Sequence, residues 1–417
     1  MRGIVFLLLA GALHAQPVYD LLLKGGHVID AKNGISAPRD VAIAKGVVAL
    51  VAPSINPSTA RRTVDVAGLY VTPGLVDIHT HVFADSMGRE YTGENCVRPD
   101  GFTFRSGVTT ISDAGSSGWR NFEQFKANVI DRSRTRVFAM LNIVGKGMAG
   151  RMDIEQDTSD MEAGKTADMA KRHSDVVVGI KIAHYAGPEW IAVDRALEAG
   201  RLANIPIMVD FATFRDERPF PELVSSRLRP GDIYTHAYLS AVPMLDASGK
   251  VLPYLFAAQK RGVIFDVGHG GGSFSFRQAI PAVKQGFLPN SISTDLHVDS
   301  MNAGMKDMLN VASKFLNMGM SLDDVVARCT WTPAQEIRRP AYGHLTQGAV
   351  ADIAVLRLER GKFGFIDSRR LRMEGTQKLT AELTIKGGQV VWDLNGLASP
   401  LWNSPEAERF TSRKKGR

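Results

Sequence analysis

The chain has 417 residues, 44% of them hydrophobic and 22% charged, which is the composition of a globular protein with a large core. Its formal net charge is +7, but apart from a cluster at the C-terminal end the basic residues are spread along the sequence. They form no patch interleaved with aromatic side chains, so we expect no nucleic-acid partner. The length suits one large α/β barrel with a smaller accessory domain better than several independent modules.

The N-terminal segment predicts export. Arg2 precedes an apolar run at residues 4–10, and small residues lead up to Ala15. This pattern is typical of a secretory signal peptide over residues 1–15. The apolar run is too short to span a bilayer, so we expect a periplasmic or extracellular protein with no stable membrane anchor after cleavage. The two cysteines, Cys96 and Cys329, are too few for a disulfide framework, and the sequence does not decide whether they pair.

Both ends of the chain predict a small β domain. Residues 18–70 contain short apolar runs separated by Gly, Asn and Pro, and residues 345–395 repeat this texture. The segment 385–391 echoes residues 23–29. We therefore expect one β-sandwich built from both chain ends, followed by a C-terminal tail at residues 396–417.

Residues 71–344 alternate apolar strands with amphipathic helices. The strand before His79 is the first of eight candidates, and the other seven cover residues 109–112, 136–140, 176–182, 205–209, 232–235, 262–267 and 291–294. Eight such units predict a (β/α)8 TIM-type barrel, whose active site lies at the C-terminal ends of the strands.

The first strand ends in Asp-Ile-His-Thr-His, residues 77–81. Because alternate side chains of a strand share a face, His79 and His81 are predicted to point the same way. Two imidazoles on one face make half of a metal site. The alternative is that both rings only hydrogen-bond to the backbone.

The fourth strand carries Lys181 within a β-branched run. Lysine is rarely buried without a partner, because its ammonium loses hydration at a large cost. Reaction of the neutral amine with CO2 would give a carbamate whose two oxygens could bridge two cations. The alternative is a lysine that extends out of the barrel rim.

Three more ionisable residues each follow a predicted strand: Asp210, His236 and Asp295. Each Asp alone could cap the next helix. Together with His79, His81 and Lys181, however, they would converge on one mouth. That donor set suits Zn²⁺, or alternatively Mn²⁺ or Fe²⁺.

Residues 71–81, Val-Thr-Pro-Gly-Leu-Val-Asp-Ile-His-Thr-His, together with Lys181, His236 and Asp295, resemble the amidohydrolase superfamily. Segments 113–118 and 265–274 resemble a dihydroorotase-like branch regarded as deacetylases. The resemblance implies two divalent metal ions. His79, His81 and Asp295 would hold the buried ion, carboxylated Lys181 would bridge, and His236 would hold the outer ion.

One position departs from the family pattern. The family has a histidine at the end of strand five, where this chain has Asp210. Asp210 could still bind the outer metal through one oxygen, but its charge would make that ion a weaker Lewis acid. His184 is a candidate to supply the missing imidazole from the same mouth; the alternative is a surface loop histidine.

The implied reaction is hydrolysis of an amide or ester bond of a small acylated substrate by a metal-bridging hydroxide. Asp295 would act as general base and then general acid. His184, His269 and Ser273 are the candidate substrate-binding residues. Two alternatives remain, a cyclic amide hydrolase like dihydroorotases and hydantoinases, and a non-catalytic barrel scaffold. A homo-oligomer is a further possibility that the sequence does not decide.

Overall fold

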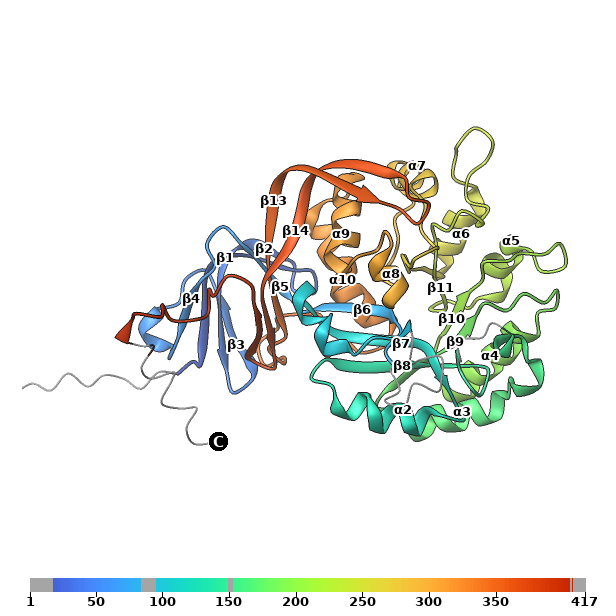
Figure 1. Cartoon of the computed structure of the whole chain (residues 1–417), viewed down its shortest axis with the longest axis horizontal. Helices are drawn as coiled ribbons and strands as arrows, with labels where there is room; N and C mark the ends of the chain where they lie inside the picture. The colour runs from blue at the N-terminus through green and yellow to red at the C-terminus, as the bar shows by residue number, and fades with distance from the viewer. Residues whose placement is uncertain (1–17, 84–94, 149–152, 406, 408–417) are drawn as a thin grey trace, which may run out of the picture.

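The computed structural model describes residues 18–83, 95–148, 153–405 and 407, so the predicted signal peptide lies outside the described residues. The described chain forms two sheets, an accessory sheet at one end of the molecule and a larger barrel at the other (Figure 1). None of the described helices combines the length and the apolar character needed to cross a bilayer.

The barrel is built on a parallel sheet in the order β12-β11-β10-β9-β8-β7-β6. Its strands are β6 (Leu75–Thr80), β7 (Val108–Gly118), β8 (Arg136–Asn142), β9 (Val177–Ala183), β10 (Ile207–Asp210), β11 (Ile233–Tyr234) and β12 (Ile264–Phe265).

The eighth strand position of the barrel is occupied by an extended segment, residues 291–296, which is not a regular strand. A parallel bridge joins Asp266 to Ser291 on one side, and another joins Thr80 to Leu296 on the other. Backbone hydrogen bonds from Val267 and His269 to this segment continue the ladder. The barrel therefore closes between β12 and β6, and the predicted (β/α)8 architecture is confirmed.

Helices cover the outside of the barrel (Figure 1), and its strands are buried on both faces, as parallel strands require. All seven residues of β9, for example, are buried. The helices are α2 (Phe122–Asn128), α3 (Ala163–Arg172), α4 (Ile191–Ala203), α5 (Phe220–Glu222), α6 (Pro253–Arg261), α7 (Phe276–Lys284), α8 (Val298–Asn302), α9 (Met308–Asn317), α10 (Leu322–Cys329) and α11 (Trp331–Glu336).

The accessory sheet combines both chain ends, as predicted. Its order is β15-β14-β13-β5-β1-β2-β3, with β4 paired to β1. Apolar side chains from both ends pack into one core under it. Its strands are β1 (Leu21–Asp30), β2 (Ile35–Ala44), β3 (Val47–Ala52), β4 (Thr63–Asp65), β5 (Tyr70–Pro73), β13 (Ile353–Ile366), β14 (Arg372–Lys386) and β15 (Gln389–Asp393).

β13 and β14, with 14 and 15 residues, form a hairpin that is longer than the other strands of the accessory sheet. It leaves the sheet and runs over the barrel helix α9 towards α7 (Figure 1). The turn between the two strands, residues 367–371, therefore lies on the barrel. This contact brings the C-terminal part of the chain close to the ends of the barrel strands.

Both cysteines are buried and unpaired. Cys96 lies near Ser116, with 3.8 Å between Sγ and Oγ, whereas Cys329 ends α10. They do not form a disulfide with each other.

Candidate metal centre

The C-terminal ends of five barrel staves bring together the six residues predicted as metal ligands. His79 lies in β6 and His81 directly follows it, Lys181 lies in β9 and Asp210 in β10, His236 follows β11, and Asp295 lies in the eighth segment, residues 291–296. All six are buried. Their donor atoms form two groups that could each hold a metal ion, His79 with His81 and Asp295, and His79 with Asp210 and His236.

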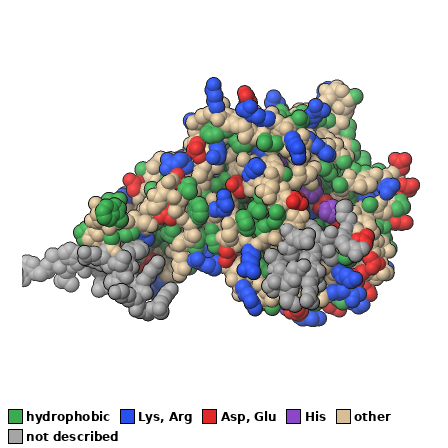
Figure 2. Space-filling view, viewed as in Figure 1, with side chains coloured by type: hydrophobic (Ala, Val, Ile, Leu, Met, Phe, Trp, Pro, Cys, Tyr) green, Lys and Arg blue, Asp and Glu red, His purple; other side chains and the backbone are tan. Residues whose placement is uncertain are grey.

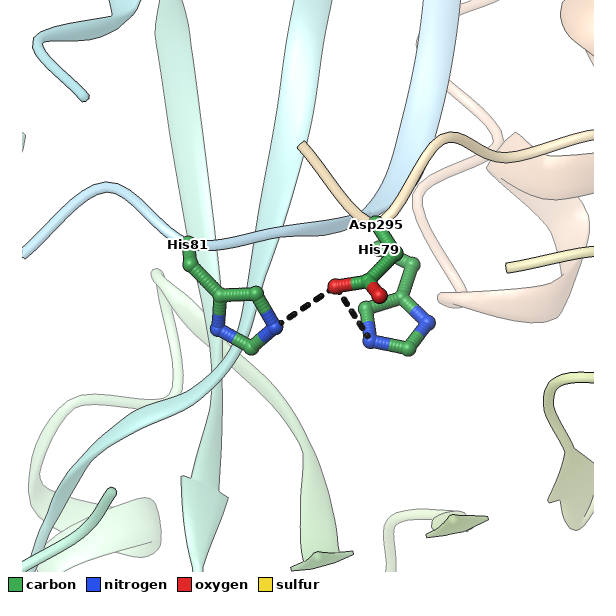
Figure 3. Close-up of side chains that lie close together, drawn as sticks. All are labelled: His79, His81 and Asp295. Atoms are coloured by element: carbon green, nitrogen blue, oxygen red, sulfur yellow. Dashed lines mark ion pairs between the residues drawn. The ribbon is translucent and has the colours of Figure 1, made fainter. Parts of the chain in front are cut away.

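The first group surrounds one carboxylate oxygen of Asp295 (Figure 3). This Oδ1 atom lies 3.0 Å from Nε2 of His81 and 3.6 Å from Nε2 of His79. The other oxygen, Oδ2, lies 3.7 Å from Nε2 of His297. Two imidazoles and a carboxylate are a common ligand set of zinc.

The second group surrounds Asp210. Its Oδ2 lies 3.2 Å from Nε2 of His236 and 3.5 Å from Nζ of Lys181. The same Lys181 amine lies 3.1 Å from Nε2 of His79. Lys181 is therefore fully buried beside His79, the residue that the two groups share, and beside Asp210 of the second group.

Hydrogen bonds fix how the three imidazoles are turned. Nδ1 of His79 lies 2.8 Å from Oγ1 of Thr235, and that hydroxyl donates its proton to Asp266 over 2.7 Å. The Thr235 oxygen must therefore accept from His79. Nδ1 of His236 donates to the Gly268 carbonyl at 2.6 Å, and Nδ1 of His81 lies 3.1 Å from the Ser116 hydroxyl.

With the Nδ1 proton of His79 and of His236 committed in this way, each ring presents the Nε2 lone pair to the centre of the mouth. Partners of this kind commonly orient the histidine ligands of metals. In addition, Oδ1 of Asp210 is buried and has no hydrogen-bond partner among the described residues. The donor set thus fits divalent metal ions, which would satisfy atoms that the protein leaves without partners.

The two carboxylates remain ionised. Burial alone would raise the pKa of Asp210, but His236, Lys181 and His184 outweigh it and hold the pKa well below its ordinary value. The pKa of Asp295 is also held well below its ordinary value, because His79 and His297 outweigh the effect of burial. Both side chains are therefore anionic ligands at neutral pH.

The backbone at the mouth is strained. His184, His236 and Asp295 all have positive φ, at 53°, 61° and 54°, a conformation that L-residues other than Gly seldom adopt. Strain of this kind persists only where the surrounding structure enforces it, and it concentrates at functional sites. Glycines make room for the ligands: a Cβ on Gly268 would lie 2.9 Å from Nδ1 of His79, and one on Gly270 would lie 2.4 Å from Oδ2 of Asp295.

His184 lies at the edge of the mouth and is part of neither group. Its Nε2 is 3.8 Å from Oδ2 of Asp210, and its Nδ1 is 2.7 Å from a carboxylate oxygen of the buried Glu155. Its side chain is 29% exposed. Figure 2 shows a small group of histidine side chains at the surface on the barrel side of the molecule. The ring lines a cavity of about 310 Å³ together with Asp153, Gln156, Ala186, Ala212 and Thr213. This placement suits substrate contact.

The other two candidate substrate-binding residues differ from each other. Ser273 is half-buried and lies near Asp295. A Cβ added to Gly270 would be 3.4 Å from Oγ of Ser273 and 2.4 Å from Oδ2 of Asp295. His269 is fully buried: its Nδ1 donates to the Gly270 carbonyl, and its Nε2 lies 2.6 Å from Nζ of Lys314. Both ring nitrogens of His269 are therefore already engaged, and this arrangement suits support of the loop rather than substrate contact.

Sequence reasoning missed the residues that support the ligands, namely Glu155, Thr235, Asp266 and Lys314. Asp266 follows an apolar strand, as Asp210 does, and this signal could have identified it. The others lie far along the chain from the residues they contact, and only the fold brings them together.

The chain is similar to known enzymes over most of its length, although no family profile matches it. A deacetylase of Brucella anthropi is 30% identical over 335 residues, which are 77% of this chain and 80% of that protein. A crystal structure of an adenine deaminase has a TM-score of 0.81 at 28% identity and covers 90% of this chain and 100% of its own. A dihydroorotase structure has a TM-score of 0.76 at 27% identity and covers 89% of this chain and 99% of its own.

Proposed function

The chain belongs to the amidohydrolase superfamily, and we propose that it is a metal-dependent hydrolase that cleaves the amide or ester bond of a small acylated substrate, as a deacetylase does. The observation that carries the proposal is the convergence of two imidazole–carboxylate groups on one buried lysine. A non-catalytic scaffold would not need to keep three oriented imidazoles and strained ligands at one mouth.

Divalent ions held by these groups would polarise the acyl carbonyl and lower the pKa of the hydrolytic water. Asp295 would take the proton of that water, because its carboxylate is ionised and its Oδ1 lies 3.0 Å from Nε2 of His81 and 3.6 Å from Nε2 of His79. As the acyl bond breaks, Asp295 returns the proton to the leaving nitrogen or oxygen. His184 and Thr213 would contact the substrate in the adjoining cavity.

We also propose that the metal is Zn²⁺ and that Lys181 is carboxylated by CO2. An ammonium 3.1 Å from Nε2 of His79 would compete with a metal ion for that lone pair, whereas a carbamate would offer an oxygen to each group. Bicarbonate should therefore increase zinc uptake by the metal-free protein. The same experiment on Lys181→Met should show no such increase; equal uptake by both proteins, with and without bicarbonate, would contradict carboxylation.

The central test is Asp295→Asn, assayed with zinc against a panel of N-acetyl amino acids and O-acetyl hydroxy acids. Because the variant keeps a ligand oxygen but cannot take a proton, we expect kcat to fall by about 10² to 10⁴ while metal content stays largely intact. Asp299→Asn is the matched control, because Asp299 is exposed four residues further on. Full activity of Asp295→Asn on a substrate that the parent protein hydrolyses would contradict the assigned role.

A second candidate is a cyclic amide hydrolase, which the dihydroorotase structure supports. The same panel, extended with dihydroorotate and hydantoins, separates the two. Hydrolysis of the cyclic amides alone would replace the first proposal by the second.

We propose, finally, that the protein is exported and that residues 1–15 are removed. Cell fractionation and N-terminal sequencing test this proposal. A cytoplasmic protein with an intact Met1 would contradict it.

A further inference from the structure

We infer that the tip of the β13–β14 hairpin, through Asp367 and Ser368, and Lys314 of α9 position the loop of residues 268–274 against the metal ligands. The accessory sheet would then help to form the active site rather than only stabilise the fold. This inference rests on the proposed function, because it concerns the same site. We call residues 268–274 the glycine-rich loop.

The glycine-rich loop contacts both metal-binding groups. The carbonyl of Gly268 accepts the Nδ1 proton of His236 at 2.6 Å, which directs Nε2 of that ring to Asp210. The backbone of Gly270 packs so closely on Asp295 that an added Cβ would meet Oδ2 at 2.4 Å. A shift of this loop would therefore turn the imidazole of His236 and change the packing of the backbone against Asp295.

The hairpin tip holds the far end of this loop by backbone hydrogen bonds. The Phe274 amide donates to Oγ of Ser368 at 3.1 Å, and the Ser368 amide donates to the Phe274 carbonyl at 3.0 Å. The Phe276 amide donates to Oδ2 of Asp367 at 3.0 Å. The other oxygen of Asp367 accepts from the amides of Arg369 and Leu371, which fixes the tip itself.

Lys314 contacts the middle of the glycine-rich loop through the side chain of His269. Its fully buried amine lies 2.6 Å from Nε2 of His269 and 2.6 Å from the Gly304 carbonyl. The His269 ring stacks on Phe274, with 4.5 Å between the ring centres. The next residues of α9 dock on β14, since Asn317 bonds to the backbone of Gln377. Helix and hairpin thus form one support for the loop.

The test compares Ser368→Ala and Lys314→Met with the parent protein, in the full chain. The first variant removes the acceptor for the Phe274 amide, and the second removes the amine but keeps the length of the side chain. Ser368→Thr keeps the hydroxyl and serves as the rescue variant. Arg372→Gln is the control, because Arg372 lies in the same hairpin and its exposed side chain pairs with the exposed Glu374.

Three measurements are needed: hydrogen–deuterium exchange of residues 268–276, the visible spectrum of the cobalt-loaded protein, and kcat and KM with an acetylated substrate. In Ser368→Ala and Lys314→Met we expect faster exchange, shifted cobalt bands, and kcat lower by about tenfold to a hundredfold with little change in KM. Ser368→Thr and Arg372→Gln should resemble the parent.

Unchanged exchange in Ser368→Ala would overturn the inference, whether or not Lys314→Met folds. A variant with faster exchange but the same cobalt bands as the parent would also overturn it. The contacts would then hold the loop without affecting the geometry of the metal site. The first two measurements need no substrate. A parent protein that hydrolyses nothing would therefore count against the proposed function, while exchange and spectra still decide on the positioning role.

Discussion

At the scale of single residues, the candidate metal centre depends on space that only glycine provides. Gly115 has a φ of 88°, and a Cβ there would lie 2.6 Å from Cγ of Lys181. We expect Gly115→Ala to lower the free energy of unfolding by more than the about 1–2 kcal/mol that positive φ alone costs. It should also reduce the metal content, because Lys181 must move away from His79.

The control for this prediction is Gly68→Ala. Gly68 has a similar φ of 77°, but nothing lies within 4 Å of its added Cβ. Urea unfolding and metal analysis of both variants separate backbone strain from the collision with Lys181. Equal losses of stability and full metal content in both variants would show that the collision is relieved without disturbing the site.

Glu336 gives a prediction about pH. Burial, with Asp266 nearby, raises the pKa of its carboxyl to about 8 from an ordinary value of 4.5. Neither carboxylate oxygen has a hydrogen-bond partner among the described residues. Because the folded protein keeps a proton that the unfolded chain releases, this group makes the fold less stable as pH rises from 4.5 to about 8.

Glu336→Gln replaces this ionisable carboxyl group by a neutral amide. We expect the variant to be more stable than the parent by on the order of 5 kcal/mol at about pH 9, and by much less at about pH 5. Thermal unfolding of both proteins at the two pH values measures the difference. The same difference at both pH values would mean that Glu336 is not protonated in the fold.

The six ligand candidates could be named from sequence because each lies in the last part of an apolar strand or just after it, and parallel strands end at one edge. The residues that hold these candidates in place by hydrogen bonds could not be named in this way. Thr235 reaches Asp266 across 31 positions, and Glu155 reaches His184 across 29. Such pairs leave no local pattern, since they depend on how neighbouring strands and loops are placed by the whole barrel.

At the scale of elements, glycine pairs show why similar sequences differ in structure. Gly387 and Gly388 form the turn between β14 and β15. The similar Lys24-Gly25-Gly26 does not turn; it is a bulge within the single strand β1. The amide of Gly25 is held there by the carboxylate of Asp40, 15 positions away. The partner strand, and not the glycine pair, decides between bulge and turn.

Asn317 at the end of α9 is the main polar anchor of the long hairpin. Its Nδ2 donates to the Gln377 carbonyl at 2.7 Å, and its Oδ1 accepts from the Thr376 amide at 2.8 Å. Because Asn317→Ala leaves these backbone groups unsatisfied, we expect it to cost about 2–3 kcal/mol of stability in urea unfolding. Asn302→Ala, at an exposed helix position, is the control. A loss no larger than that of the control would mean that the hairpin is held by apolar contacts alone.

At the scale of the whole molecule, the barrel and the accessory sheet meet at a buried carboxylate. Asp352, just before β13, accepts hydrogen bonds from Nη1 of Arg136 in β8 at 2.5 Å and from Nζ of Lys386 in β14 at 2.9 Å. The Gly387 amide adds a third at 2.8 Å. One residue therefore joins the start of a barrel strand to the β14–β15 turn of the accessory sheet.

Asp352→Ala would leave two partly buried cations without their shared anion, so we expect it to cost about 3 kcal/mol. Burial alone would raise the pKa of Asp352, but Arg136 and Lys386 lower it below 3.8, so this stabilisation is present above pH 3.8 and is lost as pH falls through the folded-state pKa. Calorimetry should show the barrel and the accessory sheet unfolding together in the parent protein and at separate temperatures in the variant. Glu374→Ala, which breaks an exposed ion pair, should change little. A single transition in Asp352→Ala, at the temperature of the parent, would mean that the two sheets are coupled mainly through the β13–β14 hairpin and α9.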